Sequence, residues 1–264
     1  MFRYPSCNLS TYDRREFPGG TVYNGDCLDV IKTLPESSVD CIVTDPPYFL
    51  GMTHNGQKGN FRDLSICRPF YRDLFNEFRR VCRPEACIYF FCDWRGYAFY
   101  YPLFDEILKA HNMLVWNKLS GPGNHYAFIH ELILFHAGKG ANIGGTNIIS
   151  DIRAFTSGAK STDGAKVHPT QKPVALIQKF IEDATAPGAV ILDTFGGSGS
   201  TAVAAVVIVQ IVDKFVKAVS RLNLLEFLYS VNVSGSGGFL KFYLRCGDSF
   251  GTGGGQHQGQ RRTR

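Results

Sequence analysis

The sequence of 264 residues lacks the paired cysteines and the long apolar runs that mark metal-binding, disulfide-rich and membrane-spanning chains. No two of its eight cysteines are separated by only two residues, as zinc knuckles require. Several lie in apolar runs, as buried reduced thiols do. The longest nearly uninterrupted apolar stretch, 202–212, is far shorter than the roughly 20 residues that span a bilayer. We therefore expect neither a metal site nor a membrane segment.

Charge of one sign is also scarce. The chain carries 28 lysines and arginines against 23 acidic residues, a net charge of +5, and much of this excess lies in residues 222–264. A basic excess suits an anionic partner, but this one is too small to establish nucleic-acid binding on its own. The first ten residues have no apolar signal region, so the expected setting is reduced and cytoplasmic.

Short apolar runs alternate with helical patterns over much of the chain, whose 44% hydrophobic content is that of a folded protein. The runs at 21–23, 39–44, 86–92, 113–116, 129–136 and 189–193 predict strands, and the patterns at 61–83, 97–110 and 173–184 predict helices. This alternation is typical of an α/β protein with a doubly wound, mainly parallel sheet. After Ala205 we expect a strand over 206–212 and a helix over 214–229.

We divide the chain into three parts. Residues 1–20 have no periodic apolar pattern and form a lead-in, residues 21–221 form the main domain, and residues 222–264 form an atypical, partly disordered segment with glycine-rich stretches. Within the main domain, residues 138–166 are rich in glycine, serine, threonine and asparagine. They predict a long loop, and loops of this length are often functional.

The sharpest motif is Asp45-Pro46-Pro47-Tyr48, which follows the apolar run 41–44. In an open α/β sheet, ligands bind at the carboxyl ends of strands. The two prolines fix φ and remove two backbone donors, so the Asp45 carboxylate, the Pro46 carbonyl and the Tyr48 ring are held with little freedom. Acceptors beside an aromatic face suit a planar group with an exocyclic amine. A proline turn would explain any one of these residues, but not all four.

A glycine-rich turn joins the run 189–193 to a helix start. In Asp193-Thr194-Phe195-Gly196-Gly197-Ser198-Gly199-Ser200-Thr201, the glycines allow a tight turn and the close approach of a ligand. The turn alone could also be an ordinary loop or a phosphate site, but it lacks the lysine of a P-loop. Just upstream lies His168-Pro169-Thr170-Gln171-Lys172-Pro173, which on its own could be a simple helix entry.

These three motifs together resemble those of the S-adenosylmethionine-dependent amino-group DNA methyltransferases, which methylate adenine N6 or cytosine N4. The resemblance covers about residues 21–205, and the catalytic motif precedes the cofactor loop, as in the circularly permuted beta group. It implies a Rossmann-like class I methyltransferase fold with Asp45, Pro46, Pro47 and Tyr48 as the catalytic motif. The cofactor-binding residues that it implies are Asp26, Thr170, Lys172, Asp193, Phe195, Gly196, Gly197, Gly199, Ser200, Thr201 and Asp213.

Two of these residues have less support than the others. Asp26 equally suits capping of the helix that begins near Leu28. The family usually has an acid at the end of the strand after the glycine loop, where it holds the ribose of the cofactor. Asp213 is the nearby acid, although the stretch 201–212 is short for both a helix and a strand.

The resemblance implies methylation of adenine N6, because aspartate before Pro-Pro-Tyr accompanies adenine more often than cytosine in this family. An N4-cytosine enzyme and a decayed relative that only binds DNA are the alternatives. The expected partner is double-stranded DNA, with phosphate contacts from Lys58, Arg62 and Arg68 and target recognition by 138–166. No metal is expected. A homodimer, a restriction endonuclease partner and a bacterial, phage or prophage-like context are compatible with the sequence.

Overall fold

The computed structural model describes residues 13–17, 19–47, 53–54, 57–58, 64–121, 123, 125–152, 171–212 and 240–245. A nine-stranded sheet and a separate two-stranded hairpin are the β-structure of these residues. The large sheet consists of β1 (Asp13–Phe17), β2 (Gly20–Asn24), β3 (Val39–Thr44), β6 (Cys82–Cys92), β7 (Asn112–Asn117), β8 (His130–His136), β9 (Ile148–Ile149), β10 (Val190–Asp193) and β11 (Leu240–Arg245). The hairpin consists of β4 (Thr53–His54) and β5 (Gln57–Lys58). The helices are α1 (Cys27–Lys32), η2 (Leu64–Cys67, a 3-10 helix), α2 (Arg68–Val81), α3 (Trp94–Leu108), α4 (Val174–Ala184) and α5 (Ser200–Val212).

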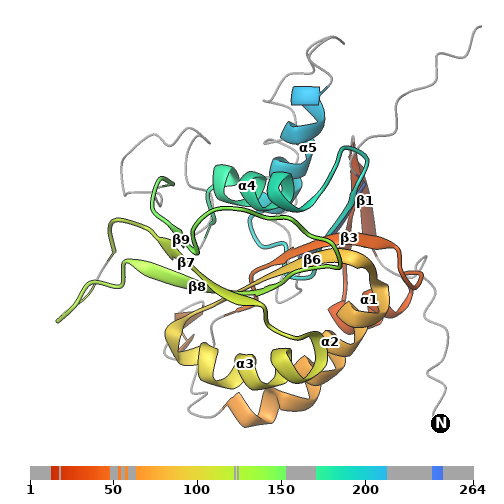
Figure 1. The fold of residues 1–264 in the computed structure, drawn as a ribbon. Helices are drawn as coiled ribbons and strands as arrows, with labels where there is room; N and C mark the ends of the chain where they lie inside the picture. The colour runs from red at the N-terminus through yellow and green to blue at the C-terminus, as the bar shows by residue number, and fades with distance from the viewer. Residues whose placement is uncertain are drawn as a thin grey trace, which may run out of the picture.

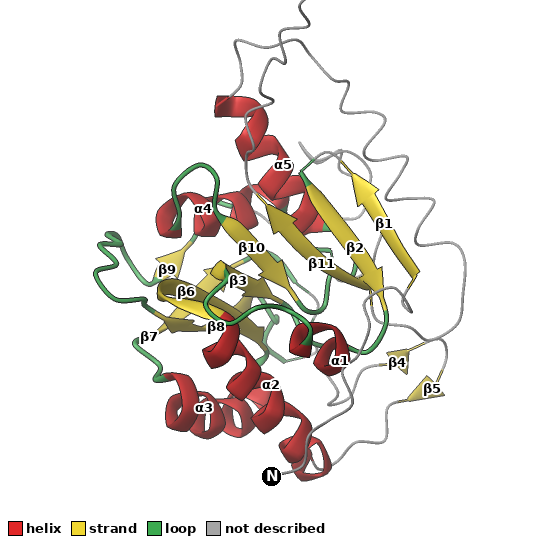
Figure 2. Cartoon of the chain, turned by 90° about the vertical axis from the view of Figure 1, so that its right-hand side faces the viewer, coloured by secondary structure: helices red, strands yellow, loops and turns green. Residues whose placement is uncertain are grey.

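The strands of the large sheet follow the order β1-β2-β11-β10-β3-β6-β8-β7-β9 (Figure 2). Its centre is parallel, with β3 between β10 and β6. Strand β8 is antiparallel to both β6 and β7, and β11 is antiparallel to both β10 and β2. Strands β2, β3, β6, β7, β9 and β10 consequently run in one direction. This arrangement confirms the predicted mainly parallel α/β sheet.

Helices cover both faces of the sheet, as a doubly wound fold requires. Helices α1, α2 and α3 lie on one face, and α4 and α5 lie on the other (Figure 1). Helix α2 buries Tyr71, Leu74, Phe75, Phe78 and Val81, a spacing of three and four residues that places them on one side of the helix. Phe70 is partly buried and packs against the same cluster of side chains.

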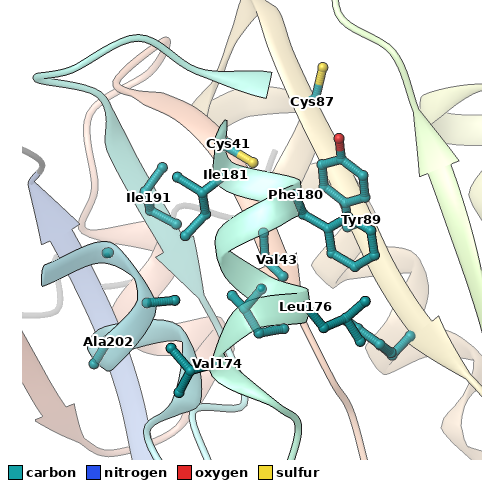
Figure 3. Close-up of a cluster of buried hydrophobic side chains, with 14 of the residues drawn as sticks. Cys41, Val43, Cys87, Tyr89, Val174, Leu176, Phe180, Ile181, Ile191 and Ala202 are labelled. Carbon is teal, nitrogen blue, oxygen red and sulfur yellow. The ribbon is translucent and has the colours of Figure 1, made fainter. Parts of the chain in front are cut away.

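The core beneath α4 joins that helix to the central strands (Figure 3). Phe180 of α4 stacks on Tyr89 of β6 with ring centroids 4.4 Å apart, and Ile181 and Leu176 are fully buried in the same cluster. Six cysteines of the described chain are free thiols. Burial raises the pKa of Cys41 well above its ordinary value, as expected for an inert core thiol.

The structure differs from the sequence-based expectations in three elements. Part of the lead-in forms β1, which pairs with β2 through the tight turn at Gly19. The strand expected over 206–212 is wrong, because α5 continues to Val212. A short apolar run does not distinguish a strand from a buried helix, and here Ala202, Ala205 and Val206 are buried beside α4. Strand β11 lies inside the segment 222–264, which was expected to be atypical and partly disordered and for which no strand was predicted.

Candidate active site

The two strand ends that carry the motifs lie side by side. Asp45 follows β3, Asp193 ends β10, and the two strands are parallel neighbours. The Thr44 hydroxyl donates to Asp193 Oδ1 at 2.9 Å and accepts from the Thr194 backbone N–H at 3.2 Å. A single threonine side chain thus joins the end of the catalytic strand to the start of the glycine turn, and it places both motifs at the carboxyl edge of the sheet.

The glycine turn is held from within by Asp193. Its Oδ1 also accepts from the Phe195 backbone N–H at 2.9 Å, and its Oδ2 accepts from the Thr201 hydroxyl at 2.7 Å. Gly197 and Gly199 have φ values of +50° and +79°, where a side chain would be strained. The Asp193 carboxylate therefore fixes the turn that leads into α5.

Asp193 is buried, and its ionisation reflects this. Burial raises the pKa of Asp193 to about 6, although hydrogen bonds from Phe195, Thr201 and Thr44 work in the opposite direction. Because the folded state holds the proton more tightly than the unfolded state does, this group makes folding less favourable as the pH rises through the window between its unfolded and folded pKa values. The ionised carboxylate is thus maintained at neutral pH at a cost in stability.

We predict that Asp193→Asn removes this pH dependence. An amide keeps an acceptor for Phe195 N–H and cannot titrate. As the pH is lowered from 7 to 4.5, the free energy of unfolding of the wild type should therefore rise relative to that of the variant. The gain should reach at most about 3 kcal/mol, the equivalent of roughly two pKa units. Thermal unfolding of both proteins across this range measures it. A difference in melting temperature that is constant with pH would contradict the assignment.

Lys172 brings the third motif to the same place. Its ammonium lies 2.5 Å from Asp45 Oδ2 and 3.1 Å from Glu131 Oε2, and its backbone carbonyl accepts from the Ser200 hydroxyl at 2.8 Å. The side chain of Lys172 is only 6% exposed. The structure therefore brings together the segment before α4, the glycine turn and the catalytic motif, three parts of the chain that the sequence had placed in one site.

Two residues of this site, Thr44 and Glu131, were not predicted from the sequence. Thr44 joins the two strand ends, while Glu131 at the start of β8 pairs with both Lys172 and Lys118. Thr44 could have been identified as a threonine that ends an apolar strand. Glu131 could have been identified as an acid near the start of an otherwise apolar strand. Lys118 follows β7, and the end of that strand has no pattern that indicates ion pairing.

The other predicted site residues are distributed as follows. Asp26 caps α1, because its Oδ1 accepts from the Leu28 backbone N–H at 2.8 Å. Phe195 is buried among the side chains of the α1–α3 face. Arg68, at the start of α2, places its guanidinium 5.6 Å from the centroid of the Phe99 ring. Lys58 belongs to β5. Tyr48, Arg62, Thr170 and Asp213 lie outside the described residues.

The backbone of the glycine turn is open at Gly197. A Cβ built on Gly197 would have only the Phe195 carbonyl oxygen within 4 Å, at 3.6 Å. Gly197 is itself exposed, whereas Gly196 and Gly199 on either side are buried. The turn thus presents open backbone at the start of α5, beside Asp45. Among the described residues, no group of three or more metal-ligating side chains accompanies this site.

The strand beside β10 departs from the expectation for the cofactor ribose. Strand β11 runs antiparallel to β10, with Phe242 opposite Asp193, so its beginning lies at the edge where a parallel strand would end. Asp213 follows a helix, α5, and not a strand. On the β11 side of β10, the described part of the chain therefore supplies no acid at the end of a parallel strand.

A mixed α/β sheet with an open glycine turn and an Asp-Pro-Pro motif at one edge defines the class I methyltransferase type of enzyme. The family model for DNA methylases matches residues 39–207, well over half of the chain. YubD of Escherichia coli (strain K12) is 31% identical over 183 residues, which cover 69% of this chain and 77% of YubD. The chain therefore belongs to the N6/N4 family of DNA methylases, whose cofactor is S-adenosylmethionine.

A second relative is the type II methyltransferase M.HpaI of Haemophilus parainfluenzae, 28% identical over 199 residues. The match covers 66% of this chain and 63% of M.HpaI, so this chain spans less than two thirds of that relative's length. The family match ends at residue 207, inside α5. Strand β11 thus lies beyond the residues that the family model matches.

Solved structures agree with the fold. The PvuII DNA methyltransferase, which is cytosine-N4-specific, has a TM-score of 0.55 at 16% identity and covers 79% of this chain and 90% of its own. TTHA0409 of Thermus thermophilus, complexed with S-adenosyl-L-methionine, has a TM-score of 0.52 at 20% identity over 69% of this chain and 81% of its own. No helix in the described part of the chain is long and apolar enough to cross a membrane.

Proposed function

We propose that this protein transfers the methyl group of S-adenosylmethionine to the exocyclic N6 of adenine in double-stranded DNA. The observation that carries the proposal is the position of Asp45, which Lys172 holds beside the glycine turn at the carboxyl edge of the sheet. A carboxylate there can accept a hydrogen bond from an amine, and the Pro46 carbonyl offers a second acceptor. Both act on the same kind of group, a planar amine.

The cofactor, when bound, supplies an electrophilic methyl group on a positively charged sulfur. The amine nitrogen would form the new N–C bond as the C–S bond breaks, the electron pair of that bond would stay on sulfur, and the amine would lose one proton to water. Asp45 and the Pro46 carbonyl accept hydrogen bonds from the amine N–H groups and so orient the nitrogen lone pair. These residues therefore act by position and electrostatics. Gly196, Gly197 and Gly199 would leave room for the cofactor, with Lys172 and Ser200 holding the adjoining backbone.

The surroundings of the site support DNA as the substrate. A base must leave the duplex to reach Asp45, which costs a few kcal/mol of lost stacking and pairing. The loop between β7 and β8 opens at the same edge and exposes Tyr126, Phe128 and Ile129, while Trp94 is exposed at the start of α3. Apolar side chains at this edge can pack against unstacked bases and offset part of that cost.

Adenine is our choice of base because aspartate precedes Pro46 and Pro47. We predict that unmethylated genomic DNA treated with the protein and S-adenosylmethionine will contain N6-methyladenine. Mass spectrometry of the nucleosides from digested DNA measures the product, with DNA treated without cofactor as the control. The appearance of 4-methylcytosine in its place would contradict the adenine assignment, whereas the absence of any methylated nucleoside would contradict the activity itself.

The antiparallel direction of β11 favours one alternative, a relative that binds DNA without methylating it. In this case the cofactor site lacks an acid for the ribose and does not hold the cofactor. Calorimetric titration with S-adenosylmethionine distinguishes the two functions, because only a methylating enzyme requires a measurable heat of binding. Target recognition by residues 138–166, a homodimer and a restriction endonuclease partner remain predictions of the sequence. Methylation sequencing and the mass of the protein in solution test the first two.

A further inference from the structure

Four charged side chains of alternating sign form a continuous chain at the active site. Lys118 Nζ lies 3.3 Å from Glu131 Oε1, Glu131 Oε2 lies 3.1 Å from Lys172 Nζ, and Lys172 Nζ lies 2.5 Å from Asp45 Oδ2. Each oxygen of Glu131 therefore serves a different lysine. Of these four residues, the proposed chemistry uses Asp45 and the lysine that holds it, Lys172, and it leaves the function of Glu131 and Lys118 unexplained.

The topology of the sheet brings these residues together. Lys118 follows the end of β7, Glu131 lies at the start of β8, and Asp45 follows β3. Because β8 runs antiparallel to β6 and β7, its start lies at the same edge as the ends of the parallel strands. Lys172 enters this edge from the segment before α4, with its ammonium 5.2 Å from the centroid of the Phe91 ring.

The chain of charges is largely withdrawn from water. The side chains of Lys172, Glu131 and Lys118 are 6%, 14% and 17% exposed. Burial disfavours the charged form of Lys172, but Asp45 and Glu131 outweigh it, so the pKa of Lys172 lies above its ordinary value. An ammonium in such a place needs a carboxylate beside it, and Lys172 has two.

The two carboxylates compete for one ammonium, and this competition affects Asp45. A lysine ammonium has three N–H donors. The donor that bonds to Glu131 is not available to Asp45, so Glu131 limits how strongly the ammonium binds Asp45. With Glu131 neutralised, Asp45 would be the remaining carboxylate of this pair. The ammonium would then move fully onto Asp45, which is the acceptor that the substrate amine requires.

We propose that Glu131 is a positioning residue for methyl transfer, which anchors the Lys172 ammonium so that it orients Asp45 without sequestering it. Lys118 forms an ion pair with Glu131 and balances its charge. The inference rests on the proposed function, because it assigns Glu131 to the same reaction. It predicts that loss of the Glu131 charge slows the chemical step and leaves cofactor binding largely unchanged.

The test uses Glu131→Gln, the shorter acid Glu131→Asp, and Asp183→Asn as a matched control. Asp183 forms an exposed ion pair with Lys179 on α4 at 2.9 Å, remote from the charge chain. We expect kcat for methyl incorporation into DNA to fall roughly 10- to 100-fold in Glu131→Gln, as misplacement of a catalytic group does. Glu131→Asp should recover part of this loss, and Asp183→Asn should match the wild type. KM for S-adenosylmethionine and the calorimetric affinity for S-adenosylhomocysteine should change less than about 3-fold in all three.

A second measurement does not depend on methylation. Acetic anhydride labels lysines in proportion to their neutral fraction and their access, and mass spectrometry of the digest reports each site. Glu131→Gln removes one of the two carboxylates that keep Lys172 charged, so the labelling of Lys172 should rise relative to that of Lys179. In Asp183→Asn, the labelling of Lys172 should equal that of the wild type. Unchanged labelling of Lys172 in Glu131→Gln would show that Glu131 does not hold it, and this would overturn the proposal even if the wild type methylated no DNA.

The outcomes separate the two levels of the argument. A wild-type protein that methylates no DNA contradicts the proposed function. An active wild type with normal kcat in Glu131→Gln overturns the positioning role alone. The same conclusion follows if kcat falls equally in Glu131→Gln and Glu131→Asp in step with their melting temperatures, because a residue with a purely structural role would give that pattern.

Discussion

Replacement of Asp45 by alanine should abolish methyl transfer and leave cofactor binding nearly intact. The carboxylate lies at the end of β3, where it accepts from Lys172 and where we place the substrate amine. Its loss removes the acceptor that orients the nitrogen, and we expect kcat to fall on the order of 1,000-fold, as when a preorganised electrostatic group is removed from an active site. The Lys172 ammonium keeps Glu131 as a partner, so the local fold should persist.

Two measurements check this prediction. Incorporation of labelled methyl groups into DNA gives the loss of kcat, and calorimetric titration with S-adenosylhomocysteine gives the affinity for the cofactor product. Asp45→Asn, which keeps the shape and one acceptor, should retain more activity than Asp45→Ala. An Asp45→Ala protein with wild-type activity would remove the basis for the catalytic assignment.

Replacement of Gly199 by valine should weaken cofactor binding by roughly 100-fold, which corresponds to about 2.7 kcal/mol. Gly199 has a φ of +79° and is buried, and its N–H donates to the Gly196 carbonyl at 2.7 Å to close the turn. A β-branched residue is strained in this conformation. The turn would have to open, and the backbone that faces the cofactor would move with it.

The chain offers a matched control for the strain itself. Gly140 has a φ of +76°, and a Cβ added there would meet nothing within 4 Å. Gly140→Val therefore carries a similar backbone strain at an exposed place outside the site, and it should lower the melting temperature without changing the affinity for S-adenosylmethionine. Equal affinities in Gly199→Val and Gly140→Val would mean that the glycine turn does not contact the cofactor.

The catalytic edge could be predicted from the sequence because local signals determine it. The apolar run of β3 ends at consecutive prolines, and the run of β10 ends at a glycine turn, so both strand ends are visible without the fold. Parallel strands then place their carboxyl ends at one edge. The meeting of Asp45 with Lys172, 127 residues apart, required in addition the resemblance to a family.

Other features depended on contacts that no local pattern contains. Glu131 gains its partners because β8 reverses direction against β6, and the apolar run alone gives no strand direction. The stretch 206–212 is apolar except for Gln210, so the packing of Val206 against α4, and not periodicity, decides for a helix. Strand β11 lies in a segment of low-complexity composition, and its pairing with β2 and β10 is its principal support.

Because β11 is synthesised long after its two neighbours in the sheet, the sheet can be completed only late in synthesis. Strand β11 is the neighbour of both β2 and β10, so it joins the hairpin of β1 and β2 to the remainder of the sheet. The ladder cannot be completed before residue 245 has left the ribosome, and until then β2 and β10 each have an open edge. Pairings across such sequence distances form slowly, and open edges invite pairing with other chains. Loss of β11 should therefore cause aggregation of the nascent chain before it affects catalysis.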